Sequence, residues 1–316
     1  MRIGFVGLST PLFYDYRYPA SIAPSDGSTS PNPILEGAFG GLLLYDELWF
    51  LCRSLCPDNM RTLSYVKFLD EMGEVPEVDP EWLPEPDKIF DRRAVDAFHN
   101  SYLDYNAVKK SANVYWDAAA DNHSHALKIG DIHLNGNSWN IKNVVFDLLL
   151  AGRLSQQVEL ITNSFTARLF KTEASSRDRI LLTELLVLDA VPQFLSPSGP
   201  YHSCVDEVRE SPYLSYFRQW IQTEAAGATN KDMLEVKAEV EAKLAESQRQ
   251  VFLKYLDPRG AYMSLAETIV GVGIDALVSG AGAIIDLMRQ RSKEKQKQGL
   301  RWQAFILQAR ATVSDV

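Results

Sequence analysis

One acidic side chain and three polar ones lie close together in the sequence, around an expected strand. Asp147 stands in an apolar run with helical spacing, and the β-rich run 158–162 ends at Thr162, with Asn163 and Ser164 directly after it. Open α/β sheets bind their ligands at the carboxyl ends of their strands. We therefore expect these four side chains to face one crevice, where Asp147 offers a carboxylate to a divalent cation.

Further carboxylates follow two other apolar segments. An expected strand, Leu42–Tyr45, ends at Asp46 and Glu47, before an expected helix, and the apolar segment 63–72 ends close to Glu71. Carboxylates are oxygen ligands of the kind that hard divalent cations accept. The alternative role for Asp46 is to cap the following helix through its first-turn amides.

A cluster of imidazoles offers a different chemistry. Three of the five histidines and one carboxylate fall close together in the chain: His123, His125, Asp131 and His133. Imidazole and carboxylate are ligands for transition metals, and a His-x-His pair on an extended strand points both rings to one side. The cluster predicts a zinc site. The alternative is a polar loop and hairpin, with a strand over Lys128–Leu134 before an Asn-Gly turn.

The amino-terminal run is typical of a buried strand that ends in a polar turn. Arg2–Leu8 is apolar, and Gly7-Leu8-Ser9-Thr10-Pro11 can bring backbone amides and two hydroxyls to a ligand. The turn lacks the glycine-rich and Gly-Lys-Ser/Thr patterns of phosphate-binding loops, so a plain strand end is the alternative. The same run has a single Arg and an early Pro, and it does not have the pattern of a signal peptide.

The stretch from Asn143 to Lys171 is an expected helix–strand–turn–helix unit, and it resembles the last third of the PIN-like nuclease fold. In that family an Asp opens the helix, as in Asp147-Leu-Leu-Leu-Ala151 here. The next strand of the family ends in a Thr-x-Asp-type turn, which in this chain reads Thr162-Asn163-Ser164.

The resemblance implies metal-dependent cleavage of RNA or DNA around Mg²⁺ or Mn²⁺. The carboxylates that it implies for this site are those of Asp46 or Glu47, Glu71 and Asp147. Asn163 stands in place of a fourth acid, which implies a weaker metal site or an inactive one.

The composition limits the class of partner and the compartment. The net charge of −9 and a pI near 5.2 disfavour broad, nonspecific affinity for nucleic acid, although a local basic patch is compatible with them. Three cysteines make neither a disulfide framework nor a complete zinc site, which favours a reducing cytoplasm. The four-residue spacing of Cys52 and Cys56 predicts that they share a buried helix face.

The order of expected elements predicts the fold class. Apolar strands alternate with helices as far as about residue 170, and nearly everything after it has helical patterning. We expect a mixed α/β core over residues 1–172, with inserted loops, and a helical carboxyl-terminal portion over residues 173–316.

The carboxyl-terminal portion supports a second hypothesis, a non-enzymatic interaction or assembly protein built on a degenerate α/β scaffold. Residues 231–310 would then form the surface for a homo-oligomer or another protein. Within them, the glycine-rich apolar segment 263–288 permits close helix packing, and its Glu267, Asp275 and Asp286 disfavour a membrane span. Deleting residues beyond Tyr262 is expected to abolish association while the body stays folded.

Overall fold

The chain folds into two compact units. The α/β unit comprises Met1–Leu181 and Gln193–His202, and the helical unit comprises Leu182–Pro192 and Ser203–Val316. The computed structural model describes residues 1–14, 32–73, 89–91, 93–95, 127–129, 132–134, 139–170, 176–188, 196–227, 233–255 and 301–314.

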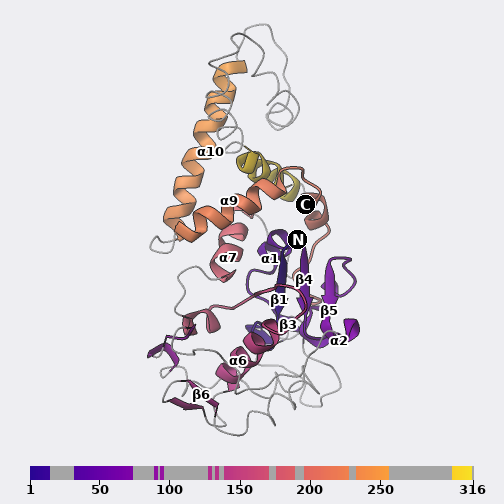
Figure 1. Ribbon diagram of the computed structural model, residues 1–316. Helices are drawn as coiled ribbons and strands as arrows, with labels where there is room; N and C mark the ends of the chain where they lie inside the picture. Colours follow the sequence, from indigo (N-terminus) through magenta and orange to yellow (C-terminus); the bar gives the residue numbers. More distant parts are fainter. Residues whose placement is uncertain are drawn as a thin grey trace, which may run out of the picture. The chain divides into compact units, whose positions relative to one another are not determined.

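A four-stranded parallel sheet forms the centre of the α/β unit (Figure 1). Its strands are β1 (Ile3–Val6), β4 (Glu47–Phe50), β5 (Val66–Phe68) and β8 (Glu159–Leu160), in the spatial order β5-β4-β1-β8. The chain therefore moves outward from β1 to β5 and returns to the other side of β1 with β8. The strand order reverses between β1 and β8, which makes their carboxyl ends the topological switch point of this sheet.

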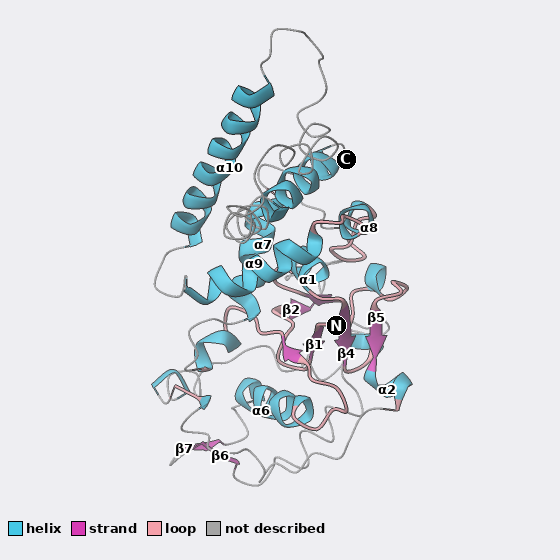
Figure 2. Cartoon of the chain, turned by 45° about the horizontal axis from the view of Figure 1, so that its top comes forward, coloured by secondary structure: helices cyan, strands magenta, loops and turns pink. Residues whose placement is uncertain are grey.

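Burial explains the sequence of the central strands. All four residues of β1, Ile-Gly-Phe-Val, are buried, as expected for a parallel strand that is covered on both faces. Helices α1 (Ala38–Leu44) and α6 (Trp139–Ala151) lie on opposite sides of β1 (Figures 1 and 2). The two glycines near β1 reflect this arrangement, because a Cβ on Gly4 would meet Tyr45 and Ile161, whereas one on Gly7 would meet Asp147 of α6.

The strand expected over Leu42–Tyr45 is wrong. These residues end the buried helix α1, and the strand β4 begins after them at Glu47. Every residue of α1 is buried, so the segment has no polar face whose spacing would distinguish a short helix from a strand. As a result, Asp46 and Glu47 lie at the beginning of a strand instead of its end.

Other expected elements of the α/β unit are confirmed, with shifted bounds. The strand at Arg2–Leu8 is β1, and the helix and strand around Asp147 are α6 and β8. The strand predicted over Lys128–Leu134 is wrong, because its residues belong to two antiparallel strands, β6 (Leu127–Ile129) and β7 (Ile132–Leu134). The remaining elements of this unit are β2 (Phe13–Tyr14), β3 (Pro33–Ile34), α2 (Leu69–Met72) and three short 3₁₀ helices, Arg53–Leu55, Asp58–Met60 and Thr166–Leu169.

Cys52 and Cys56 are buried but do not share a helix. They flank the 3₁₀ helix Arg53–Leu55, and both have extended backbone conformations. Burial raises the pKa of both thiols, so they are inert core groups.

Aromatic packing organises the helical unit. Its described helices are α8 (Cys204–Arg209), α9 (Leu214–Gly227), α10 (Met233–Tyr255) and a helix over residues 301–314, while α7 (Ser176–Val187) begins in the α/β unit and ends in the helical one. Phe217 of α9 stacks on Phe305 with centroids 4.6 Å apart, and Trp220 stacks on Trp302 at 4.1 Å. The fold is thus a mixed α/β core with a helical carboxyl-terminal portion, as expected.

The sequence also left a question about a membrane span. No helix in the described part of the chain has both the length and the apolar character needed to cross a bilayer. The glycine-rich segment 263–288 lies outside the described residues.

Candidate functional site

Asp147 lies at the switch point, wholly buried beneath the turn that follows β1. Its Oδ1 accepts the Leu8 amide at 2.9 Å, and its Oδ2 accepts the Ser9 amide at 2.7 Å and the Ser9 hydroxyl at 2.5 Å. The backbone amides that the sequence offered to a ligand thus bind a carboxylate of the protein itself. These bonds use three of the about four acceptor positions of a carboxylate, and the remaining position is on Oδ1.

Gly7 makes room for this carboxylate. A Cβ at position 7 would lie 2.2 Å from Cγ and Oδ1 of Asp147, which is far inside van der Waals contact. The position therefore requires glycine for close approach of a helix side chain to the backbone.

Burial sets the protonation of Asp147. Removal from water raises the pKa of its carboxyl to about 7, and the hydrogen bonds from the Ser9 hydroxyl and the Ser9 and Leu8 amides oppose this rise. In the unfolded chain the carboxyl has its ordinary pKa near 4. Between these two values the folded protein therefore binds more protons than the unfolded chain.

We expect the free energy of unfolding to fall as the pH rises from about 4 to about 7, since the stabilisation is complete below the unfolded pKa and lost through the folded one. The loss attributable to this group is on the order of 1 kcal/mol per pH unit within the window. Urea unfolding at pH 5, 6, 7 and 8 measures it. Asp147→Asn, whatever its absolute stability, should show a flatter profile than the native chain, and an identical slope would contradict the assignment.

Two buried oxygens without hydrogen-bond partners accompany Asp147. The Oδ1 of Asn143 and the Oγ1 of Thr162 are inaccessible to solvent and make no hydrogen bond. Asn143 is one helical turn before Asp147 on α6, so the two share a helix face. Thr162 is two residues beyond Leu160, the last residue of β8, which pairs with Phe5 of β1.

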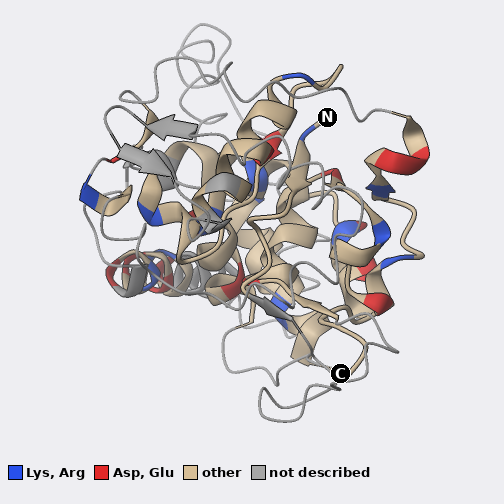
Figure 3. Ribbon diagram, turned by 90° about the horizontal axis from the view of Figure 1, so that it is seen from below, with Lys and Arg blue, Asp and Glu red and all other residues tan. Residues whose placement is uncertain are grey.

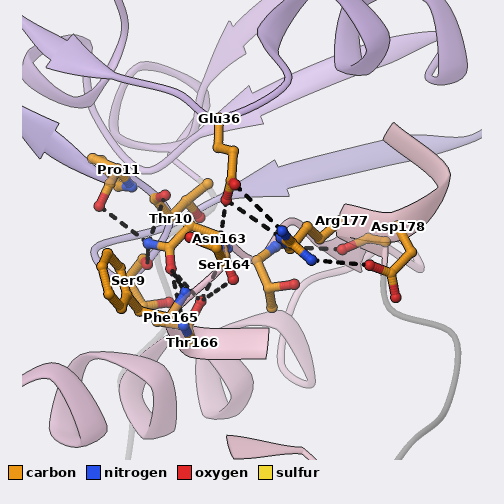
Figure 4. Close-up of polar contacts among 12 residues, drawn as sticks. Ser9, Thr10, Pro11, Glu36, Asn163, Ser164, Phe165, Thr166, Arg177 and Asp178 are labelled. Carbon is orange, nitrogen blue, oxygen red and sulfur yellow. Dashed lines mark hydrogen bonds and ion pairs between the residues drawn. The ribbon is translucent and has the colours of Figure 1, made fainter. Parts of the chain in front are cut away.

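Asn163 is the most heavily bonded side chain at the switch point (Figure 4). Its Nδ2 donates to the carbonyl oxygens of Ser9, Thr10 and Pro11. Its Oδ1 accepts the amides of Phe165 and Thr166 and the Thr166 hydroxyl. The amide is thus saturated and clamps the turn after β1 to the turn after β8.

Glu36 is a site residue that sequence reasoning missed. Its Oε2 accepts the backbone amide of Ser164, and its carboxylate pairs with Arg177, which also bonds Asp178 at 3.1 Å (Figure 4). Glu36 follows a long polar segment and precedes Gly37, whose φ of 70° is left-handed. No spacing in the sequence distinguished this carboxylate from an ordinary loop acid.

The structure does not bring Asp46 and Glu47 to Asp147. Asp46 accepts the Arg2 amide at 2.6 Å, and Glu47 is opposite Ile3 in the sheet register and accepts the Trp49 indole N–H. Both acids are therefore at the amino end of the sheet, whereas Asp147 binds residues beyond its carboxyl end. The expectation that Asp46 or Glu47 shares a pocket with Asp147 is therefore wrong.

Glu71 lies at the carboxyl end of the sheet, as Asp147 does, but it follows β5, which is two strands away from β1. It is exposed and forms a two-pronged ion pair with Arg53. An exposed pair of this kind contributes little to stability and leaves Glu71 outside the switch point.

The histidine cluster is only partly within the described residues. His133 stands in β7, opposite Lys128 of β6, and His123, His125 and Asp131 lie outside the residues that the structure describes. Within the described segments, no three His, Cys, Asp or Glu residues group in a way that could hold a metal ion.

A divalent cation of the kind that the PIN-like resemblance implies fits a revised set of ligands. Asp147 has an unused acceptor position, and Asn143 and Thr162 add the two unpartnered oxygens. All three are hard oxygen donors, and Mg²⁺ is commonly bound by one or two carboxylates together with water and substrate phosphate. The saturated Asn163 does not fit such a role.

Comparison with known proteins found no match. Neither the protein-family models, nor the curated proteins, nor the solved structures contain a match to the chain.

Proposed function

We propose that the α/β unit hydrolyses phosphodiester bonds of RNA or DNA with the help of Mg²⁺ or Mn²⁺, in the manner of a PIN-like nuclease. The observation that supports this is the buried Asp147 carboxylate at the switch point, with unpartnered buried oxygens on Asn143, one helical turn before it on α6, and on Thr162, just beyond β8. A buried acid with a raised pKa in the ligand-binding region of an open sheet is typical of functional sites.

Each of these residues has a role in the proposal. Asp147, Asn143 and Thr162 would hold the cation, and a bound cation there supplies an activated water and neutralises developing phosphate charge. The Leu8 and Ser9 amides fix the orientation of the carboxylate, and the Ser9 hydroxyl shields it from solvent. Gly7 keeps the distance between β1 and α6 short enough for these contacts.

The charge distribution is compatible with local phosphate contacts only. Basic and acidic positions are interspersed along the described ribbon (Figure 3). Arg153 and Arg168 are exposed on the segments before and after β8, and they are the cations that we assign to substrate phosphates. Such a footprint supports a small nucleic-acid interface whose affinity falls with added salt.

Calorimetric titration of the full chain with Mn²⁺ tests the proposal. We expect binding by the native protein, none by Asp147→Asn, and native affinity for Asp46→Asn, because Asp46 lies at the other end of the sheet. Binding should strengthen from pH 6 to pH 8, since the cation competes with the proton on Asp147. Loss of binding in Asp46→Asn together with native binding in Asp147→Asn would refute the site.

Cleavage of labelled single-stranded RNA and DNA then tests the reaction. Activity should require Mg²⁺ or Mn²⁺ and should disappear in Asp147→Asn. Native protein that binds Mn²⁺ without cleaving either nucleic acid would refute the nuclease and leave a cation site of another function.

A second candidate function is an interaction protein on a degenerate scaffold. The observation in its favour concerns Asn163, at the position of the family's fourth acid. Its amide nitrogen and oxygen both form hydrogen bonds that hold the turn after β1 to the turn after β8. Absence of Mn²⁺ binding by the native chain would favour this candidate over the nuclease.

A further inference from the structure

Three backbone carbonyl oxygens converge on one point next to the proposed cation site. The Nδ2 of Asn163 lies 3.0 Å from the oxygen of Ser9, 3.1 Å from that of Thr10 and 3.2 Å from that of Pro11. An amide nitrogen has only two hydrogens, so three oxygens share them. Three consecutive carbonyls turned inward need a positive partner, because their dipoles repel one another.

The other end of the amide fixes which atom faces the carbonyls. Oδ1 accepts the Phe165 and Thr166 amides, each at 2.9 Å, and the Thr166 hydroxyl at 3.2 Å. Hydrogen-bond donors therefore surround Oδ1, and acceptors surround Nδ2. If the amide were flipped, Nδ2 would face the N–H donors and Oδ1 would face the carbonyl oxygens. The side chain has a single orientation in which every contact is satisfied.

We propose that the amide nitrogen of Asn163 takes the position of a second cation, so that the crevice binds one divalent ion and not two. Convergent carbonyl oxygens are the ligands that Ca²⁺ and Mn²⁺ accept when a carboxylate completes the set. Asn163 supplies a partial positive charge there and no carboxylate. This inference deepens the proposed function, because it makes cleavage by this chain a one-cation reaction centred on Asp147.

Neighbouring charges fit this arrangement. Glu36 is an acid in the bonding network of the turn, since it accepts the amide of Ser164, and it forms an ion pair with Arg177. Arg177 is thus the cation to which both Glu36 and Asp178 are bonded in this network (Figure 4). A carboxylate at position 163 would introduce a negative charge directly against three carbonyl oxygens.

The substitution Asn163→Asp tests the inference through the number of Mn²⁺ ions that the chain binds. Calorimetric titration of the full chain with Mn²⁺ should give one ion for the native protein and two for Asn163→Asp. Asn59→Asp is the matched control, because the Asn59 amide donates to a single carbonyl, that of Tyr201, at 3.1 Å. It adds the same charge without a ring of carbonyls and should leave the count at one.

The outcomes separate this inference from the proposed function. Two ions in the native protein, or an unchanged count in folded Asn163→Asp, would overturn the inference. No ion in the native protein and one in Asn163→Asp would sustain the inference and refute the proposed function. Circular dichroism shows whether Asn163→Asp folds with and without Mn²⁺. Folding that requires Mn²⁺ would sustain the inference, and failure to fold at saturating Mn²⁺ would count against it.

Discussion

Gly7→Ala should strongly destabilise the α/β unit. The added Cβ would lie 2.2 Å from the Asp147 carboxyl, so either α6 or the turn after β1 must move, and the three hydrogen bonds to Asp147 go with it. Overpacking costs about 1–3 kcal/mol and each lost hydrogen bond to a charged group about 1.5–3 kcal/mol, so we expect a loss of more than about 3 kcal/mol. Urea unfolding measures it.

Gly41→Ala is the matched control for this prediction. Gly41 lies inside α1 in the same unit, and a Cβ there would meet no atom within 4 Å. Because alanine favours a helix interior over glycine, we expect stability to be unchanged or raised by about 0.5–1 kcal/mol. Equal losses in the two variants would show that Gly7 has no special contact with Asp147.

Phe305→Ala should have a comparable effect in the helical unit. Phe305 is completely buried and stacks on Phe217 at 4.6 Å, one helical turn from the Trp220–Trp302 stack. Truncation of a buried phenylalanine costs about 3–5 kcal/mol. Urea unfolding followed by far-UV circular dichroism measures the loss, because α9, α10 and the helix over residues 301–314 contribute helical signal from this unit.

Phe305→Leu serves as the control, since it keeps most of the buried apolar surface and should lose much less stability. If both variants unfold with native midpoints, the helix over residues 301–314 is not part of the core of this unit. The deletion of residues beyond Tyr262 removes this helix and the side chains of Trp302 and Phe305. A test of assembly through residues 231–310 therefore needs substitutions at exposed positions, because the deletion would also disrupt the core.

Sequence patterns located the elements of the site well where periodicity was clear. The apolar face around Val144 and Val145 identified α6, and the β-rich run after Gln157 identified β8. The expectation that Asp147 opens its helix is wrong, because α6 begins at Trp139 and Asp147 lies in its second half. The prediction failed at Leu42–Tyr45, because a helix buried on all sides has no polar face to reveal its period.

The ligand set depended on contacts that no spacing reveals. Asp46 and Glu47 had the right chemistry. They lie at the amino end of the sheet, however, because the residues before them form the helix α1 and the strand β4 begins only at Glu47. Glu36 and Asn143 had no distinguishing pattern in the sequence, and Glu36 reaches the Ser164 amide only because chain segments 128 residues apart meet there.

By itself, the sequence determined the mixed α/β class and the helical carboxyl-terminal portion, because hydrophobic periodicity and turn residues act within about 20 neighbouring residues. Only the tertiary structure decided which acids share a site, and that Asn163 is a clamp between two turns. These properties depend on strand order and on distances between residues more than 130 positions apart, such as Leu8 and Asp147 with a separation of 139, and local patterns contain no information about them.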